Sequence, residues 1–167
     1  AMIAEVSADL GVQVILEPGR VIAGNAGVML TTALYEKTAP DRSFLIVDAG
    51  MNDLMRPALY GAHHDIQPLK QAAPDAPEKT YDVVGPICES TDKFASGRDM
   101  PAVEPGERLA FMSAGAYGAV LSSSYNTRPL VPEVLVNGDR FDIVRRRPDL
   151  EEMLQLEQVP DWLKRTD

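Results

Sequence analysis

The sequence is poor in cysteine, histidine and positive charge. Its one cysteine, Cys88, excludes an intrachain disulfide and a Cys-rich zinc site, and suits a reducing compartment. Sixteen Lys and Arg residues against 25 Asp and Glu residues give a net charge of −9, which disfavours binding to nucleic acid or to an anionic membrane surface. We recognise no secretory signal and no apolar run that could span a bilayer, so we expect a cytoplasmic protein.

Apolar residues, in contrast, are plentiful. They make up 45% of the 167 residues, which is enough to bury a real core in about one domain. The chain opens with apolar residues at helical spacing, followed by the β-branched run 12–16 and by an uninterrupted stretch, 23–37, that predicts a second helix. This helix-strand-helix order is typical of the end of a repeated βα pattern. We therefore predict that residues 1–38 are the remnant of a larger α/β domain.

From residue 39 to residue 167 the pattern predicts an antiparallel β domain. Short β-like runs, separated by Gly and Pro, occupy 44–47, 81–84, 108–112, 130–136 and 140–144. Asn137-Gly138 predicts a hairpin with a type I′ turn between the last two runs. Residues 149–156 predict a closing helix.

Two arginines are candidates for binding anions. Arg20 ends the segment Glu17-Pro18-Gly19-Arg20, which follows the first strand at the edge where parallel α/β sheets place their sites. Arg56 and Tyr60 are four residues apart, so a helical turn would place both on one face, where they suit a carboxylate. The alternative is that both segments are surface turns: Arg20 would then be solvated, and Tyr60 would pack at the domain edge.

Cys88 is followed by Glu89, and Asp92 lies close behind. The acids favour a protonated thiol, able to donate a proton, over a papain-like nucleophile. A buried structural cysteine is the alternative. His63 and His64 are adjacent and have no Cys or His cluster near them, so we predict no metal site and a structural or solvent role for both.

Tyr117 lies in a small-residue stretch, 115–121, after the run 108–112. The stretch could begin a helix whose free amides favour an anion, with the hydroxyl of Tyr117 as a further donor. A buried helix of small residues is the alternative.

Four motifs in this order resemble those of the diaminopimelate decarboxylases: Glu17-Pro18-Gly19-Arg20, Met55-Arg56-Pro57 to Tyr60, Cys88-Glu89-Ser90-Thr91-Asp92 and Gly115-Ala116-Tyr117. The resemblance covers nearly the whole chain, including Asn126-Arg128-Pro129. It implies a pyridoxal-phosphate enzyme of the alanine-racemase-like fold type, built from a (β/α)8 barrel and a C-terminal β-barrel or sandwich domain. This family works as a head-to-tail homodimer, and the chain resembles its C-terminal part.

The resemblance also implies a role for each motif. Glu17, Pro18, Gly19 and Arg20 would bind the pyridoxal 5'-phosphate, with Arg20 also reaching the substrate, and Tyr117 would contact both. Arg56 and Tyr60 would bind the far end of meso-2,6-diaminopimelate, which the enzyme converts to L-lysine and CO2 in lysine biosynthesis.

The remaining motif would act across the dimer. Cys88, the catalytic proton donor, and Glu89, which accepts a substrate ammonium, would enter the active site of the partner subunit.

The Schiff-base lysine of this family lies in the barrel, and none of the chain's lysines matches it: Lys37, Lys70, Lys79, Lys93 and Lys164. We therefore expect the chain alone to be inactive. Two alternatives stay open. One is a related ornithine, arginine or carboxynorspermidine decarboxylase, although Glu89 stands where ornithine-type members have Asp. The other is a non-catalytic β module that self-associates through apolar surface.

Overall fold

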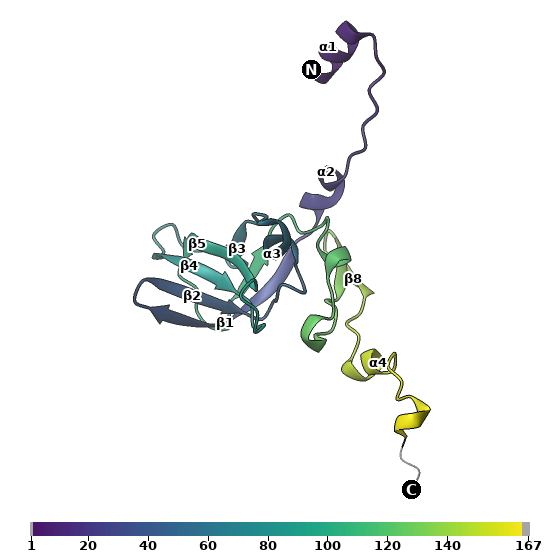
Figure 1. Ribbon diagram of the computed structural model, residues 1–167. Coiled ribbons are helices and arrows are strands. Elements are labelled where there is room, and N and C mark those ends of the chain that lie inside the picture. Colours follow the sequence, from purple (N-terminus) through teal and green to yellow (C-terminus); the bar gives the residue numbers. More distant parts are fainter. Residues whose placement is uncertain (1, 165–167) are drawn as a thin grey trace.

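The structure is a computed structural model that describes residues 2–164 (Figure 1). Its helices are short: α1 (Met2–Leu10), α2 (Arg20–Ala23), η1 (Gly24–Ala26), α3 (Arg56–Tyr60), η2 (Ala119–Leu121), η3 (Tyr125–Thr127), α4 (Leu150–Leu154) and η4 (Asp161–Leu163). Its strands are β1 (Met29–Ala39), β2 (Arg42–Val47), β3 (Ile66–Pro68), β4 (Glu78–Val84), β5 (Lys93–Pro101), β6 (Arg108–Phe111), β7 (Glu133–Asn137) and β8 (Arg140–Arg145). None of the helices within 2–164 has the length and apolar character to cross a membrane.

A six-stranded sheet with the order β3-β6-β1-β2-β4-β5 forms the centre of the molecule. The long strand β1 joins its two halves, because residues 29–32 pair with β6 and residues 33–39 pair with β2. The mainly β fold is confirmed. The expectation of a purely antiparallel sheet is wrong for one pair, since β2 and β4 are parallel from Ser43↔Tyr81 to Ile46↔Val84.

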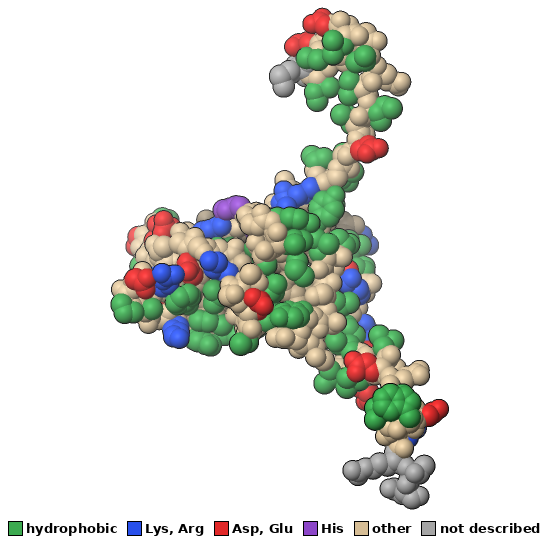
Figure 2. Space-filling view, viewed as in Figure 1, with side chains coloured by type: hydrophobic (Ala, Val, Ile, Leu, Met, Phe, Trp, Pro, Cys, Tyr) green, Lys and Arg blue, Asp and Glu red, His purple; other side chains and the backbone are tan. Residues whose placement is uncertain are grey.

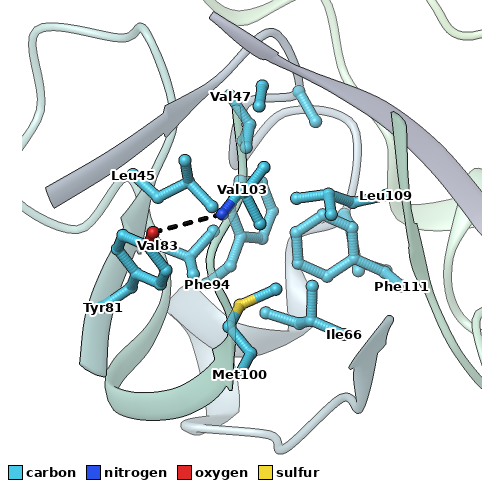
Figure 3. Close-up of a cluster of buried hydrophobic side chains, with 13 residues drawn as sticks. Leu45, Val47, Ile66, Tyr81, Val83, Phe94, Met100, Val103, Leu109 and Phe111 are labelled. Carbon is cyan, nitrogen blue, oxygen red and sulfur yellow. Dashed lines mark hydrogen bonds between the residues drawn. The ribbon is translucent and has the colours of Figure 1, made fainter. Parts of the chain in front are cut away.

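The sheet encloses an apolar core (Figure 3). The rings of Phe94 and Phe111 lie 4.6 Å apart at a tilt of 48°, a favourable arrangement for aromatic pairs. Tyr81 is buried in the same cluster, and its hydroxyl accepts a hydrogen bond from the Val103 amide at 3.3 Å. Because this polar atom has a partner, the core can bury a phenol without leaving its oxygen unsatisfied.

Two predicted elements at the start of the chain are wrong. Residues 29–39 form β1 instead of a helix, because pairing with β2 and β6 satisfies their backbone and buries Thr31 and Ala33. Residues 12–16 form no strand: their side chains are exposed, and they belong to an extended segment that leads from α1 to α2 (Figure 1). The predicted opening helix is confirmed as α1. The division into a barrel remnant, 1–38, and a β domain, 39–167, stays a prediction.

The C-terminal part consists of the separate β7-β8 hairpin and of short helices beyond it. The hairpin is confirmed, but its turn is Gly138-Asp139 with positive φ at Gly138 alone, so it is not of type I′. The closing helix is confirmed as α4. It begins after Asp149, whose carboxylate accepts from the Glu152 amide at 2.8 Å in a capping box.

Candidate functional site

The segment around α2 packs against the chain that follows β6, and glycine makes this close approach possible. The Ala114 amide donates to the Gly27 carbonyl at 2.8 Å, and the Gly115 amide donates to the Gly24 carbonyl at 3.0 Å. A Cβ atom on Gly115 would lie 2.1 Å from the carbonyl oxygen of Ala23. A Cβ atom on Gly27 would likewise lie 2.6 Å from the Cα atom of Gly115, so both glycines are needed for these two predicted motifs to meet.

Arg20, Gly19 and Tyr117 come together at this contact. The Arg20 Nη2 atom donates to the Ser113 carbonyl at 3.2 Å, whereas its buried Nε atom has no hydrogen-bond partner among residues 2–164. A Cβ atom on Gly19 would lie 2.9 Å from the Tyr117 hydroxyl. Glu17 and Pro18 are exposed in the extended segment just before them.

The backbone at this place is strained. Ser113 and Tyr117 both have left-handed φ angles, 57° and 56°. Non-glycine residues in this region cost on the order of 1 kcal/mol or more, and they gather at functional sites. The predicted helix over 115–121 is wrong in part, since only 119–121 form a helical turn, η2.

Arg56 begins α3 and Tyr60 ends it, as the spacing predicts. Pro57 stands in the first turn, and Gly61 closes the helix with φ 61° and donates to the Pro57 carbonyl at 3.0 Å. The half-buried Arg56 places its Nη1 atom 3.0 Å from His64 Nε2, whereas Tyr60 is exposed. The two side chains share one helical turn but lie in different surroundings.

His64 connects Arg56 to the end of β6. Its Nδ1 atom lies 2.8 Å from the Met112 carbonyl oxygen, and its side chain is buried. Burial lowers the pKa of His64 and the charge of Arg56 adds to this effect, whereas the hydrogen bond to Met112 opposes it. A structural role for His64 was predicted, but not its contact with Arg56.

Cys88 and Glu89 lie on a loop that is built around one carboxylate. Asp92 accepts hydrogen bonds from the Ile87 amide at 2.6 Å and from the Met51 amide at 2.7 Å. A Cβ atom on Gly85 would lie 2.3 Å from this carboxylate, so glycine is required there. Burial raises the pKa of Asp92, although these hydrogen bonds act in the opposite direction.

The thiol of Cys88 is exposed on this loop, and Glu89 is half-buried. Within residues 2–164, neither side chain forms a hydrogen bond to Arg20, Arg56 or Tyr117. The structure thus brings the arginines and Tyr117 into one region through the end of β6. Cys88 and Glu89 form a second group.

A polar network around Arg128, which the sequence analysis did not predict, holds the segment before α3 and the Cys88 loop in place. Arg128 donates to Asp53 at 3.2 Å, to Asn52 at 3.0 Å and to the Asp48 carbonyl at 2.7 Å. Asn52 and Asp53 are buried, and the neighbouring Met51 amide holds the Asp92 carboxylate. The network fixes the segment before α3 and the Cys88 loop together. Asn126-Arg128-Pro129 was part of the resemblance, but nothing local indicated its partners.

Comparison with known proteins identifies relatives of the chain. Residues 8–115 match the model of the C-terminal sheet domain of the pyridoxal-dependent decarboxylases. A diaminopimelate decarboxylase from Zymomonas mobilis is 44% identical over 162 residues, which are 97% of this chain and 38% of that protein. One from Pseudomonas aeruginosa is 51% identical over 139 residues, which are 83% of this chain and 33% of that protein. The chain spans about a third of the length of these relatives.

Several solved structures are also similar to the chain. A diaminopimelate decarboxylase from M. jannaschii in complex with L-lysine superposes with a TM-score of 0.86 at 32% identity, covering 98% of this chain and 38% of that one. AQ1208 from Aquifex aeolicus gives a TM-score of 0.84 at 42% identity, covering 92% of this chain and 39% of that one. An arginine decarboxylase of a Chlorella virus, 21% identical with a TM-score of 0.66 over 74% of this chain and 35% of that one, shares the fold.

Proposed function

We propose that this chain, which belongs to the pyridoxal-dependent decarboxylase family, is the C-terminal part of an enzyme that converts meso-2,6-diaminopimelate to L-lysine and CO2. One observation carries the choice of substrate. Two guanidiniums, those of Arg20 and Arg56, are tied to the consecutive carbonyls of Ser113 and Met112, the second through His64. A dicarboxylate offers each of these half-buried arginines its own charged partner.

The residues near α2 fit the phosphate of pyridoxal 5'-phosphate. A Cβ atom at Gly19 would meet the Tyr117 hydroxyl, and in the described part of the chain the buried Arg20 Nε atom is a donor without a partner. We infer that the backbone from Glu17 to Arg20, including Pro18, holds the phosphate, and that Tyr117 orients it. The cofactor, when bound, accepts the electrons that remain after CO2 departs.

The other motif residues act on the substrate. Arg56 and Tyr60 bind the carboxylate at the far end, and Glu89 accepts a hydrogen bond from the ammonium there. Cys88 holds a proton at Sγ and delivers it to the carbon that has lost CO2. Cys88 and Glu89 serve the site of the partner subunit in a cytoplasmic homodimer. In support, neither side chain forms a hydrogen bond to Arg20 or Arg56 within residues 2–164.

The proposal is tested on the full-length polypeptide that contains this chain, purified with pyridoxal phosphate. We expect it to release lysine from meso-diaminopimelate and to leave ornithine and arginine unchanged. The 167-residue chain alone, as the matched control, should release none, since its lysines do not include the Schiff-base residue. Faster turnover of ornithine or arginine, or lysine release by the isolated chain, would contradict the proposal.

A further inference from the structure

The two arginines of the candidate site are attached to the protein in different ways. Arg20 donates directly to the Ser113 carbonyl, whereas Arg56 reaches the neighbouring Met112 carbonyl through the imidazole of His64. The Nδ1 to oxygen distance is 2.8 Å and the Nε2 to Nη1 distance is 3.0 Å. The imidazole thus stands between a group that can only accept and a group that can only donate.

We propose that His64, in its neutral form with the proton on Nδ1, positions the guanidinium of Arg56 for the far carboxylate of the substrate. This inference rests on the proposed function. The hydrogen-bond chemistry requires that form. A carbonyl oxygen only accepts, so Nδ1 carries the proton, and a guanidinium only donates, so Nε2 offers its lone pair. A protonated imidazole would donate from both nitrogens and would lose Arg56.

The surroundings of His64 keep it neutral. Its side chain is 2% exposed. Arg56 of α3 and Arg20 of α2 both place positive charge near the ring. Arg98 of β5 donates to the His64 carbonyl at 3.1 Å and to His63 at 3.1 Å.

The carboxylate of Asp65, the next residue along the chain, lies 3.5 Å from Arg98 and forms an ion pair with that guanidinium. Burial and the charges of Arg56 and Arg20 together lower the pKa of His64. The ring is therefore an uncharged acceptor at neutral pH.

Such an acceptor matters because an arginine side chain has many rotamers. Holding one nitrogen of Arg56 against His64 restricts those rotamers before the substrate arrives and leaves other N–H groups for a carboxylate. Because both links end on consecutive residues, Met112 and Ser113, the spacing of Arg56 and Arg20 is fixed as well. His64 thereby contributes to selection of a substrate by the distance between its carboxylates.

Two variants of the full-length holoenzyme separate the two hydrogen bonds of His64. In His64→Asn the amide nitrogen can take the place of Nδ1 and donate to Met112, but nothing accepts from Arg56. In His64→Gln the longer side chain offers an oxygen to Arg56. We expect the Asn variant to raise KM for meso-diaminopimelate about tenfold with little change in kcat, and the Gln variant to restore KM. His63→Asn is the matched control and should match the parent.

Two inhibitors show whether the effect concerns the far carboxylate. L-lysine keeps that carboxylate, whereas 1,5-diaminopentane has none. In His64→Asn the inhibition constant of lysine should rise by the same factor as KM, and that of diaminopentane should stay unchanged. Equal weakening of both inhibitors would show a general structural role and would overturn the inference.

The pH dependence of KM is a second test, which remains available even if the His64→Asn variant does not fold. The lowered pKa of His64 places its protonation at a pH below 6.5, the ordinary value for histidine; as the pH falls through that lower range, protonation of His64 releases Arg56 and KM of the parent rises. His64→Gln cannot titrate, so its KM should stay flatter over the same range. The inference is overturned if the parent and His64→Gln have the same KM profile. Failure of the parent to release lysine at any pH would instead contradict the proposed function, and the inference with it.

Discussion

Apolar side chains are buried in the central sheet, whereas apolar side chains at the two ends of the chain are exposed to solvent. Phe111 in β6 is 0% exposed, whereas Phe141 in β8 is 72% exposed and Trp162 in η4 is 81% exposed. Figure 2 shows hydrophobic side chains along both segments that extend from the sheet. The sheet buries its own apolar surface within the chain, and the ends do not.

This difference bears on the proposed assembly. Burial of apolar area is the main favourable contribution to the free energy of folding. The exposed apolar side chains at the ends therefore do not stabilise the isolated chain. We propose that the barrel domain and the partner subunit cover the ends in the complete enzyme. The central sheet should then account for nearly all the stability of the isolated chain.

The largest expected effect is in the core. Phe111→Ala removes a ring that packs on Phe94, and should lower the free energy of unfolding by about 4 kcal/mol. Phe141→Ala is the matched control, with the same chemical change at an exposed position, and should change it by less than about 0.5 kcal/mol. Urea unfolding of the isolated chain measures both. Similar losses in the two variants would show that the hairpin is part of the same cooperative unit.

The sequence predicted those parts of the fold whose signal is local. The short β-like runs became β2, β4, β6, β7 and β8, and the helices predicted near both ends of the chain were found as α1 and α4. The prediction failed for residues 29–39, because their apolar spacing also suits a helix and the deciding partners, β2 and β6, are remote in sequence. The parallel β2-β4 pair was missed for the same reason, since strand direction depends on the path between the strands.

For the candidate site, motifs predicted the residues but not the contacts between them. The sequence motifs selected Arg20 and Arg56 as binders of carboxylates. They did not reveal the link from Arg56 through His64 to Met112, because His64 and Met112 are 48 residues apart in the sequence. Arg128 is 75 residues from Asp53. Hydrogen bonds between residues so far apart in the sequence produce no periodic pattern, so they cannot be predicted from residue spacing.

An intermediate effect is expected from the polar network at the end of β2. Arg128→Gln leaves the buried carboxylate of Asp53 without its cation, which should cost about 2 kcal/mol in the free energy of unfolding. Arg146→Gln breaks the exposed pair with Glu152 and should have no measurable effect. The thiol of Cys88 provides an independent reading: a looser loop should change its rate of reaction with a thiol reagent in Arg128→Gln alone. Unchanged stability and rate would contradict the supporting role of the network.

The smallest effect is expected in α4, outside the sheet. Asp149→Ala removes the carboxylate that accepts from the Glu152 amide, and a lost cap of this kind costs about 1 kcal/mol of helix stability. Because α4 contributes no residue to the core cluster, this cost should stay local. We expect amide exchange at Glu152 to become about fivefold faster, while the urea midpoint of the sheet stays the same. The conservative variant Asp149→Asn keeps an oxygen acceptor and should retain most of the protection. A midpoint that shifts with Asp149→Ala would mean that α4 unfolds together with the sheet, and that the two regions are not independent.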